Sequence, residues 1–242
     1  MGKELKTIGF AAIICLVCSL LLAAVYSGLK SEQDRNKVVD MKVKVLTAFG
    51  VDISDDKGRI TKTSKEIEEI FDAQVKGEVL DNNGNLVDLS VGSLTEEQIN
   101  TRDEDGLKQY YPLYTYTDLN SGRKLYGIHV SGKGLWSLIK GYLAMEDDLF
   151  TIAGIAFYEH QETPGLGGEI EKDFFQNGFK GKTFIENGVV KEFRVIKPGT
   201  KGDDHCVDGI TAATMTCKGV ANFLNSDFAV YNKYFEKSRK LK

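Results

Sequence analysis

A long apolar run opens the chain. Residues Ile8 to Leu29 contain no charged side chain. At about 1.5 Å of rise per residue, a helix over this run is roughly 33 Å long, which is enough to cross a bilayer. A cleaved signal peptide is the alternative, but its apolar region is only about 7–15 residues and ends at a small-residue site that this run matches in part. The pattern therefore predicts an uncleaved transmembrane helix over residues 8–29.

Basic residues flank the apolar run on both sides and bias its orientation only weakly. Lys3 and Lys6 precede it, while Lys30, Arg35 and Lys37 follow it among acidic residues. No second run of this kind follows in the sequence. If residues 1–7 form a cytoplasmic N-terminus, residues 30–242 form an extracytoplasmic soluble region.

Helical spacing continues beyond the apolar run. Apolar positions between residues 38 and 46 predict an amphipathic helix that leads away from the membrane and stops at Gly50. A second helix is predicted over residues 63–75, with Ser64 as its N-cap. Residues 94–109 are highly charged and predict a loop.

In the rest of the chain, runs in which apolar and polar residues alternate are separated by turn residues, and this pattern predicts antiparallel strands. Hairpins are expected over residues 77–90, 110–132 and 182–197, and a buried strand over 149–160. Residues 134–145 predict a short helix or a glycine-broken connection, residues 167–179 a short helix, and residues 208–235 one or two closing helices. The fold class is α+β, with antiparallel hairpins and interleaved helices after one N-terminal transmembrane helix.

Composition and charge exclude several classes of protein. The net charge is -4 and no arginine-rich stripe is present, so no nucleic-acid partner is expected. Cys206 and Cys217 could meet as a disulfide or remain free thiols. The histidines His129, His160 and His205 fit no zinc-ligand spacing, so no metal site is expected. The nucleophile elbow of a hydrolase is also missing, and we expect no catalytic residue in this chain alone.

A glycine-rich turn follows the predicted buried strand. It reads His-Gln-Glu-Thr-Pro-Gly-Leu-Gly-Gly-Glu from His160 to Glu169. Glycines let a backbone approach a ligand closely, and the preceding proline stiffens the turn. A dinucleotide fingerprint fails because Ile170 stands where the third glycine would be. A tight turn without a ligand remains the alternative. Glu162 and Glu169 are further candidates, as an acid/base pair.

Hydroxyl residues cluster just before the closing helix. Thr211, Thr214 and Thr216 surround two alanines and follow Asp208, whose side chain could bond to turn amides. Free N–H groups and the positive end of the helix dipole favour a phosphate at such a position. From the residues alone, a threonine-rich helix cap is the simpler alternative.

Together these two stretches resemble the FMN-binding domains of membrane redox complexes. Residues 208–216 resemble the flavinylation motif, in which an Asp precedes Ser/Thr-Gly-Ala-Thr-x-Ser/Thr, and residues 162–169 resemble the domain's second signature. Residues 132–170, together with the single N-terminal span, resemble the C subunits of the Na⁺-translocating NADH:quinone reductases. One departure is Ala212, which stands where the motif usually has glycine.

The resemblance implies an FMN-binding domain at about residues 120–228 with FMN joined by a phosphoester to a threonine. By matching positions, Thr214 is the expected acceptor and Thr216 the fallback. The other cofactor-binding residues implied are Thr211, Ala213, Asp208, Glu162, Thr163, Gly165, Leu166 and Gly167. A flavin transferase would install the group by moving FMN from FAD.

The resemblance also implies a place in a larger assembly. The chain would relay electrons within an assembly of six subunits in a bacterial inner membrane, which oxidises NADH, reduces quinone and exports Na⁺. The alternatives are the G subunit of an Rnf-type ferredoxin:NAD⁺ oxidoreductase, which shares both motifs, and a membrane-anchored binding domain without flavin.

Overall fold

The computed structural model describes residues 2–55 and 59–240. The chain divides into two units, residues 1–41 and residues 42–242, and we describe each by itself. Residues Gly2–Ala48 form one continuous helix, α1, that belongs to both units. Within it, an 18-residue window reaches a mean hydropathy of 2.8, and α1 is the one helix in the described residues long and apolar enough to cross a membrane.

The end of α1 confirms the predicted stop. Gly50 adopts a left-handed backbone with φ of +72°, and the amide of Val51 donates back to the carbonyl of Leu46 at 3.0 Å. A glycine takes this conformation without the Cβ penalty that other residues carry, which explains why the helix ends here.

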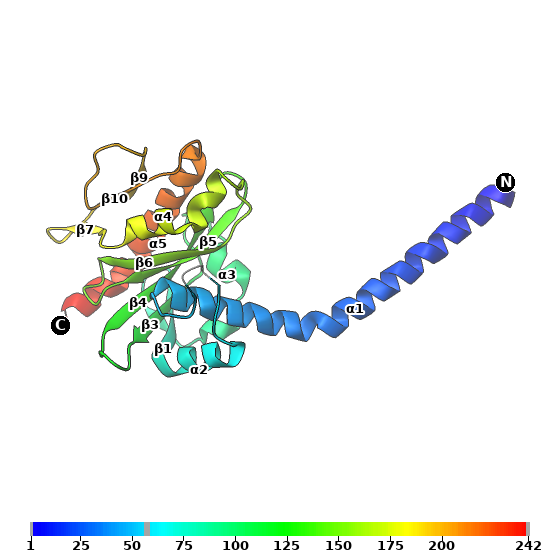
Figure 1. Ribbon diagram of the computed structural model, residues 1–242, viewed down its shortest axis with the longest axis horizontal. Coiled ribbons are helices and arrows are strands. Elements are labelled where there is room, and N and C mark those ends of the chain that lie inside the picture. The colour runs from blue at the N-terminus through cyan, green and yellow to red at the C-terminus, as the bar shows by residue number, and fades with distance from the viewer. Residues whose placement is uncertain (1, 56–58, 241–242) are drawn as a thin grey trace. The chain divides into compact units, whose positions relative to one another are not determined.

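The second unit is built on a six-stranded antiparallel sheet in the order β2-β1-β3-β4-β5-β6 (Figure 1). The strands are β1 (Val75–Asp81), β2 (Leu86–Val87), β3 (Tyr110–Thr117), β4 (Lys124–Lys133), β5 (Leu138–Met145) and β6 (Ile152–Glu159). Two short ribbons lie outside it: β7 (Ile185–Glu186) with β8 (Val189–Val190), and β9 (Arg194–Ile196) parallel to β10 (Cys206–Asp208). The mixed architecture confirms the predicted α+β class.

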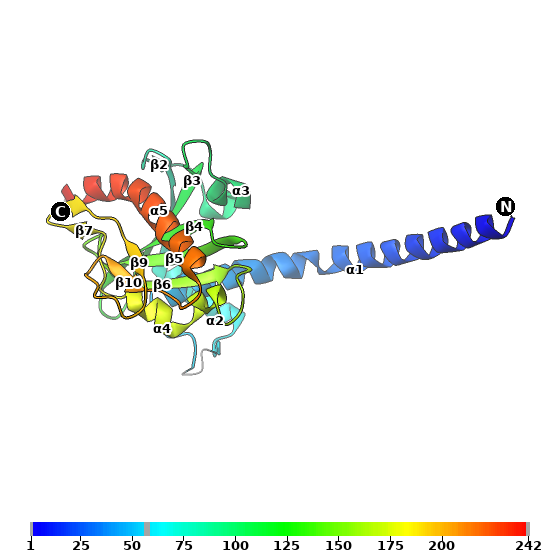
Figure 2. The same cartoon turned by 90° about the horizontal axis from the view of Figure 1, so that it is seen from above.

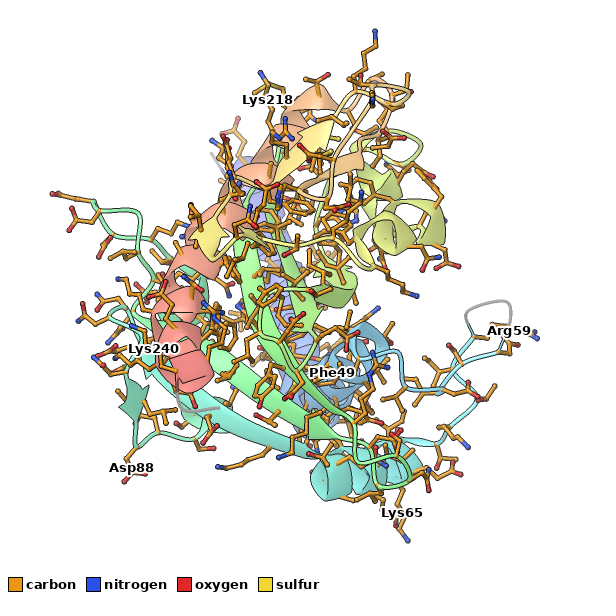
Figure 3. All side chains as sticks on the ribbon, turned by 90° about the vertical axis from the view of Figure 1, so that its left-hand side faces the viewer. Phe49, Arg59, Lys65, Asp88, Lys218 and Lys240 are labelled. Carbon is orange, nitrogen blue, oxygen red and sulfur yellow. The ribbon has the colours of Figure 1, made fainter. Side chains whose placement is uncertain are left out.

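Helices complete the second unit. They are α2 (Ser64–Gln74), η1 (Val91–Ser93), α3 (Glu96–Asn100), η2 (Gly167–Glu171), α4 (Asp173–Gln176), η3 (Asn177–Phe179) and α5 (Thr214–Lys240). Helix α5 lies along the sheet next to β4 (Figure 2). On the other face, Phe49 stacks on Tyr116 with ring centroids 5.1 Å apart, and Figure 3 shows Phe49 beside the strands. Both faces of the sheet are therefore covered.

The strand β5 corrects the expected helix or connection over residues 134–145. β5 lies between β4 and β6, and all of its residues after Leu138 are buried. A strand that is buried on both faces shows no polar alternation, so its pattern is easily mistaken for a helix. Gly141 lies at a register shift, where an added Cβ would come within 2.9 Å of the Ala156 carbonyl oxygen.

Two smaller expectations also change. The N-cap of α2 is Thr63 rather than Ser64, because Thr63 and Glu66 form a reciprocal capping box. The region predicted as a loop contains the short helix α3, which another capping box between Thr95 and Gln98 stabilises. The closing segment is one helix, α5.

A buried charge cluster fixes α5 to the sheet. The carboxylate of Asp227 accepts hydrogen bonds from Lys108 Nζ and Arg102 Nη2, both at 2.7 Å, and from the Ser131 amide at 2.9 Å. Burial lowers the pKa of Lys108 to about 8, although the Asp227 charge opposes this shift. Such a network holds the helix, and therefore its first turn, in one position on the sheet.

Candidate functional site at the start of helix α5

Three segments far apart in the sequence meet near the first turn of α5. They are the turn between β4 and β5, the glycine loop after β6, and the residues that follow β10. The carboxylate of Glu162 is the common contact. It accepts hydrogen bonds from the Trp136 amide at 2.9 Å, the Ser137 amide at 3.3 Å and the Thr216 hydroxyl at 2.6 Å.

Glu162 is only 4% exposed. Burial by itself raises the pKa of its carboxyl, but hydrogen bonds from Thr216 and the amides of the β4–β5 turn outweigh burial and lower the pKa. Glu169 has a different partner, because its Oε1 accepts from the Gly165 amide at 3.1 Å. The two carboxylates considered as an acid/base pair thus bind separate groups.

Glycines make the meeting of the three segments possible. An added Cβ on Gly134 would lie 2.6 Å from Glu162 Oε1, and one on Gly167 would lie 2.5 Å from the Thr216 hydroxyl oxygen. A Cβ on Gly219 would overlap the Lys133 carbonyl oxygen. Each contact is shorter than real Cβ atoms accept, so the junction requires glycine at these positions.

The glycine loop is a compact turn. The amides of Leu166 and Gly168 both donate to the Thr163 carbonyl, at 3.1 and 2.9 Å, and Gly165 has φ of +76°. Thr163, Gly165 and Leu166 are exposed, whereas Gly167 is buried against Thr216. The loop therefore presents its first part to solvent and anchors its end on α5.

The two candidate acceptor threonines lie in opposite environments. Thr214 is the first residue of α5 and is exposed. Thr216 is 1% exposed and its hydroxyl donates to Glu162. Of the two threonines, only Thr214 is accessible from solvent.

The helix cap is not a threonine. Ala213 precedes α5 and its carbonyl accepts the first helical bond, from Cys217. Alanine has no side-chain oxygen for the amides of the first turn, and is a poor N-cap. Thr211 is exposed, and Ala212 takes a left-handed backbone with φ of +61°. The threonines thus surround the helix start without capping it.

The Asp208 side chain was expected to bond to amides of the turn before α5, but other groups bind these amides. Asp208 ends β10 and is exposed, and within residues 59–240 it makes no hydrogen bond to a turn amide. Instead the Gly209 amide donates to the Ile196 carbonyl at 2.7 Å, and the Ile210 amide to the Cys217 sulfur at 3.3 Å. Cys206 and Cys217 are both buried free thiols, so the structure contains no disulfide between them.

A cleft of about 360 Å³ opens beside Thr214. It combines apolar side chains with two lysines, and its lining residues are Val195, Ile196, Lys197, Pro198, Gly209, Ile210, Thr211, Ala212, Thr214, Cys217 and Lys218. Figure 3 labels Lys218 near the start of α5. The volume falls within the range of small-molecule sites, about 300–1,000 Å³.

Apolar side chains are exposed at the same junction. Trp136 is 70% exposed, and Leu135, Leu166 and Met215 are also exposed. The amide of Trp136 binds Glu162, Leu166 precedes Gly167, and Met215 lies between the two threonines. The sequence patterns did not single out Trp136 or Met215. Its being the one tryptophan in the sequence was the available signal for Trp136.

These residues fit FMN. An accessible hydroxyl, an uncapped helix N-terminus and two cleft lysines suit a phosphate group. An apolar cleft and exposed apolar side chains suit the flavin ring. Thr214, Lys197 and Lys218 line the same cleft and would hold the phosphate, and the exposed residues at the β4–β5 turn and glycine loop would offer apolar surface to the ring.

Comparisons with known proteins identify the family of the chain. The family described as the FMN-binding domain matches residues 134–227, a range that contains both the glycine loop and the threonines. The C subunit of the Na⁺-translocating NADH-quinone reductase of Vibrio vulnificus is 30% identical over 231 residues, which cover 89% of this chain and 87% of that protein. Its counterpart from Vibrio alginolyticus is 29% identical over 253 residues, covering 95% of this chain and 91% of that protein. The similarity therefore extends well beyond the FMN-binding domain.

Two solved structures are similar to this fold. The crystal structure of the C subunit from Parabacteroides distasonis is 29% identical with a TM-score of 0.71, covering 86% of this chain and 96% of that one. The corresponding structure from Shewanella oneidensis is 28% identical with a TM-score of 0.71, covering 87% of this chain and 100% of that one. The chain therefore belongs to the family of C subunits of the Na⁺-translocating NADH-quinone reductases.

Proposed function

We propose that this chain is an electron-carrier subunit that holds FMN through a phosphoester to Thr214. The observation that carries the proposal is the contrast between the exposed Thr214 and the buried Thr216, whose hydroxyl is already bound to Glu162. Removing Thr216 from that contact would leave a buried carboxylate without one of its donors. The expected acceptor is therefore Thr214, and Thr216 serves the structure.

A flavin transferase installs the group in this proposal. The Thr214 oxygen bonds to the FMN phosphorus of FAD, the phosphoanhydride bond breaks, AMP leaves and the hydroxyl proton is lost. The bound flavin supplies electron transfer, accepting electrons from one redox centre and passing them to another. The chain's own residues would position it: Lys197 and Lys218 would bind the phosphate, and Leu166, Trp136 and Met215 would shield the ring from water.

The partners in this proposal are the other subunits of a complex that oxidises NADH, reduces quinone and exports Na⁺. The relatives' names support this assembly, because they describe a component of a Na⁺-translocating NADH-quinone reductase. We infer that α1 anchors the chain through residues 8–29 and that the FMN-binding domain lies on the extracytoplasmic side. Trypsin added to intact spheroplasts should then degrade residues 30–242, while protection until lysis would contradict this orientation.

Mass spectrometry of the full chain, produced together with a flavin transferase, tests the attachment. The wild type should gain the mass of one FMN less one water, and Thr214→Ala should not gain it. Thr211→Ala is the matched control, because Thr211 is also exposed and lines the same cleft. Loss of the added mass only in Thr216→Ala would move the site. If neither the wild type nor any variant gained the mass, the proposal that FMN is attached to this chain would be refuted.

A further inference from the structure

Glu162 carries a negative charge that forms no ion pair with a cation among the described residues. Its hydrogen-bond partners are backbone amides and the Thr216 hydroxyl, all of them neutral donors. No Lys, Arg or His forms an ion pair with it within residues 2–55 and 59–240. Hydrogen bonds from these donors hold the pKa of its carboxyl below its ordinary value. The carboxylate is therefore ionised near neutral pH.

The charge lies against the first turn of α5, the turn in which the flavin is proposed to be attached. Glu162 lies in the glycine loop, and its Oε2 is 2.6 Å from the hydroxyl oxygen of Thr216, two residues after Thr214 on α5. The glycines at positions 134 and 167 leave room for both carboxylate oxygens, so the group is fixed between the β4–β5 turn and α5. A fixed charge in a partly dry site acts more strongly on its neighbours than one in bulk water.

We propose that the buried, negatively charged carboxylate of Glu162 lowers the reduction potential of the flavin attached at Thr214. The inference rests on the proposed function, because it needs FMN at that position. Reduction adds negative charge to the flavin, and a nearby fixed negative charge opposes that addition. Neutralising Glu162 without changing its shape should then favour reduction.

The test is a spectroelectrochemical titration of the flavin in the loaded full chain. Glu162→Gln keeps the shape of the side chain and removes its charge. We expect its midpoint potential to be more positive, with a change in the equilibrium constant of about tenfold per electron. A tenfold change corresponds to about 59 mV for one electron. Mass spectrometry of the same samples confirms that FMN is attached.

Two further variants separate charge from loosening of the site. Thr216→Val removes a donor but leaves the carboxylate charged and less compensated, so its potential should equal or fall below that of the wild type. Glu169→Gln neutralises another carboxylate of the same loop. Among the described residues, this carboxylate accepts a hydrogen bond only from the Gly165 amide, so the variant should shift the potential much less.

The outcomes are distinct from failure of the proposed function. Wild-type protein without the added mass would overturn the attachment itself. Loaded Glu162→Gln with an unchanged potential would overturn the inference alone. A positive shift of equal size in Glu162→Gln and Thr216→Val would also overturn it, because loosening then explains both. If Glu162→Gln fails to load, a positive shift in Thr216→Val overturns the inference and its absence supports it.

Discussion

The hydroxyl oxygen of Thr216 lies 2.6 Å from Oε2 of Glu162, which joins α5 to a loop 54 residues earlier in the chain. Both groups are buried. A hydrogen bond to a buried charged group contributes more to stability than a neutral one at the surface, and an unpaired partner is costly. The contact therefore supports the shape of the site as well as distinguishing the two threonines.

Thr216→Val should lower the free energy of unfolding by about 1–3 kcal/mol, because the Glu162 carboxylate loses its shortest hydrogen bond. Thr214→Val should change it by less than about 0.5 kcal/mol, since Thr214 is exposed. Urea denaturation of the full chain in detergent, followed by circular dichroism, measures both values. Equal losses in the two variants would contradict the assigned environments.

Ala212→Gly should raise the free energy of unfolding by about 0.5–1 kcal/mol. Ala212 adopts φ of +61°, a left-handed conformation that costs a residue with a Cβ about 1–2 kcal/mol. Glycine removes this strain from the folded state, but it also makes the unfolded chain more flexible, which offsets part of the gain in stability. Ala221→Gly is the control: it lies inside α5 and should destabilise by about 0.5–1 kcal/mol. The same sign in both variants would count against strain at Ala212.

Gly167→Ala should lower stability by about 1–3 kcal/mol and reduce the yield of FMN attachment. The new Cβ would lie 2.5 Å from the Thr216 hydroxyl oxygen and 2.9 Å from Glu162 Oε2, so the loop or α5 must move. Gly92→Ala meets only Ser90 Oγ, at 3.8 Å, and should leave both quantities nearly unchanged. Thermal unfolding and mass spectrometry measure the two effects, and a full FMN yield in Gly167→Ala would refute the link.

Low pH should reduce the free energy of unfolding, partly through protonation of Glu162. The pKa of this carboxyl is lower in the folded state than its ordinary value of 4.5, so the folded state binds fewer protons there than the unfolded chain. The stabilisation is present above pH 4.5 and is lost as the pH falls through the folded pKa. Comparing denaturation of the wild type and Glu162→Gln from pH 7 to 3 checks this. The difference in stability between the two proteins should shrink below pH 4.5. A difference that stays constant would contradict the stabilising role of the Glu162 carboxylate.

Local signals in the sequence predicted much of the fold. The Asn187-Gly188 turn joins β7 and β8 as expected, with both residues at positive φ. Gly50 ends α1 because a left-handed residue closes its last turn. Signals of this kind depend on a few adjacent residues, and they survive in the folded chain for that reason.

Long-range packing decided the features that the sequence did not reveal. β5 is buried on both faces, which erased the alternation that identifies a strand. The environment of Thr216 depends on Glu162, which approaches it only when the glycine loop folds onto α5. The positions of the motifs were thus predictable, while the roles of the individual hydroxyls needed the tertiary contacts.

Trp136 is the one tryptophan among the 242 residues, and its exposed side chain stands at the turn whose amide binds Glu162. Indole emission overlaps the near-ultraviolet and blue absorption of oxidised flavin, so a ring nearby quenches it by energy transfer. The chain therefore carries its own optical probe at the site. Attachment and reduction of the flavin would each change the emission of a single residue, without a label and without signal from a second tryptophan.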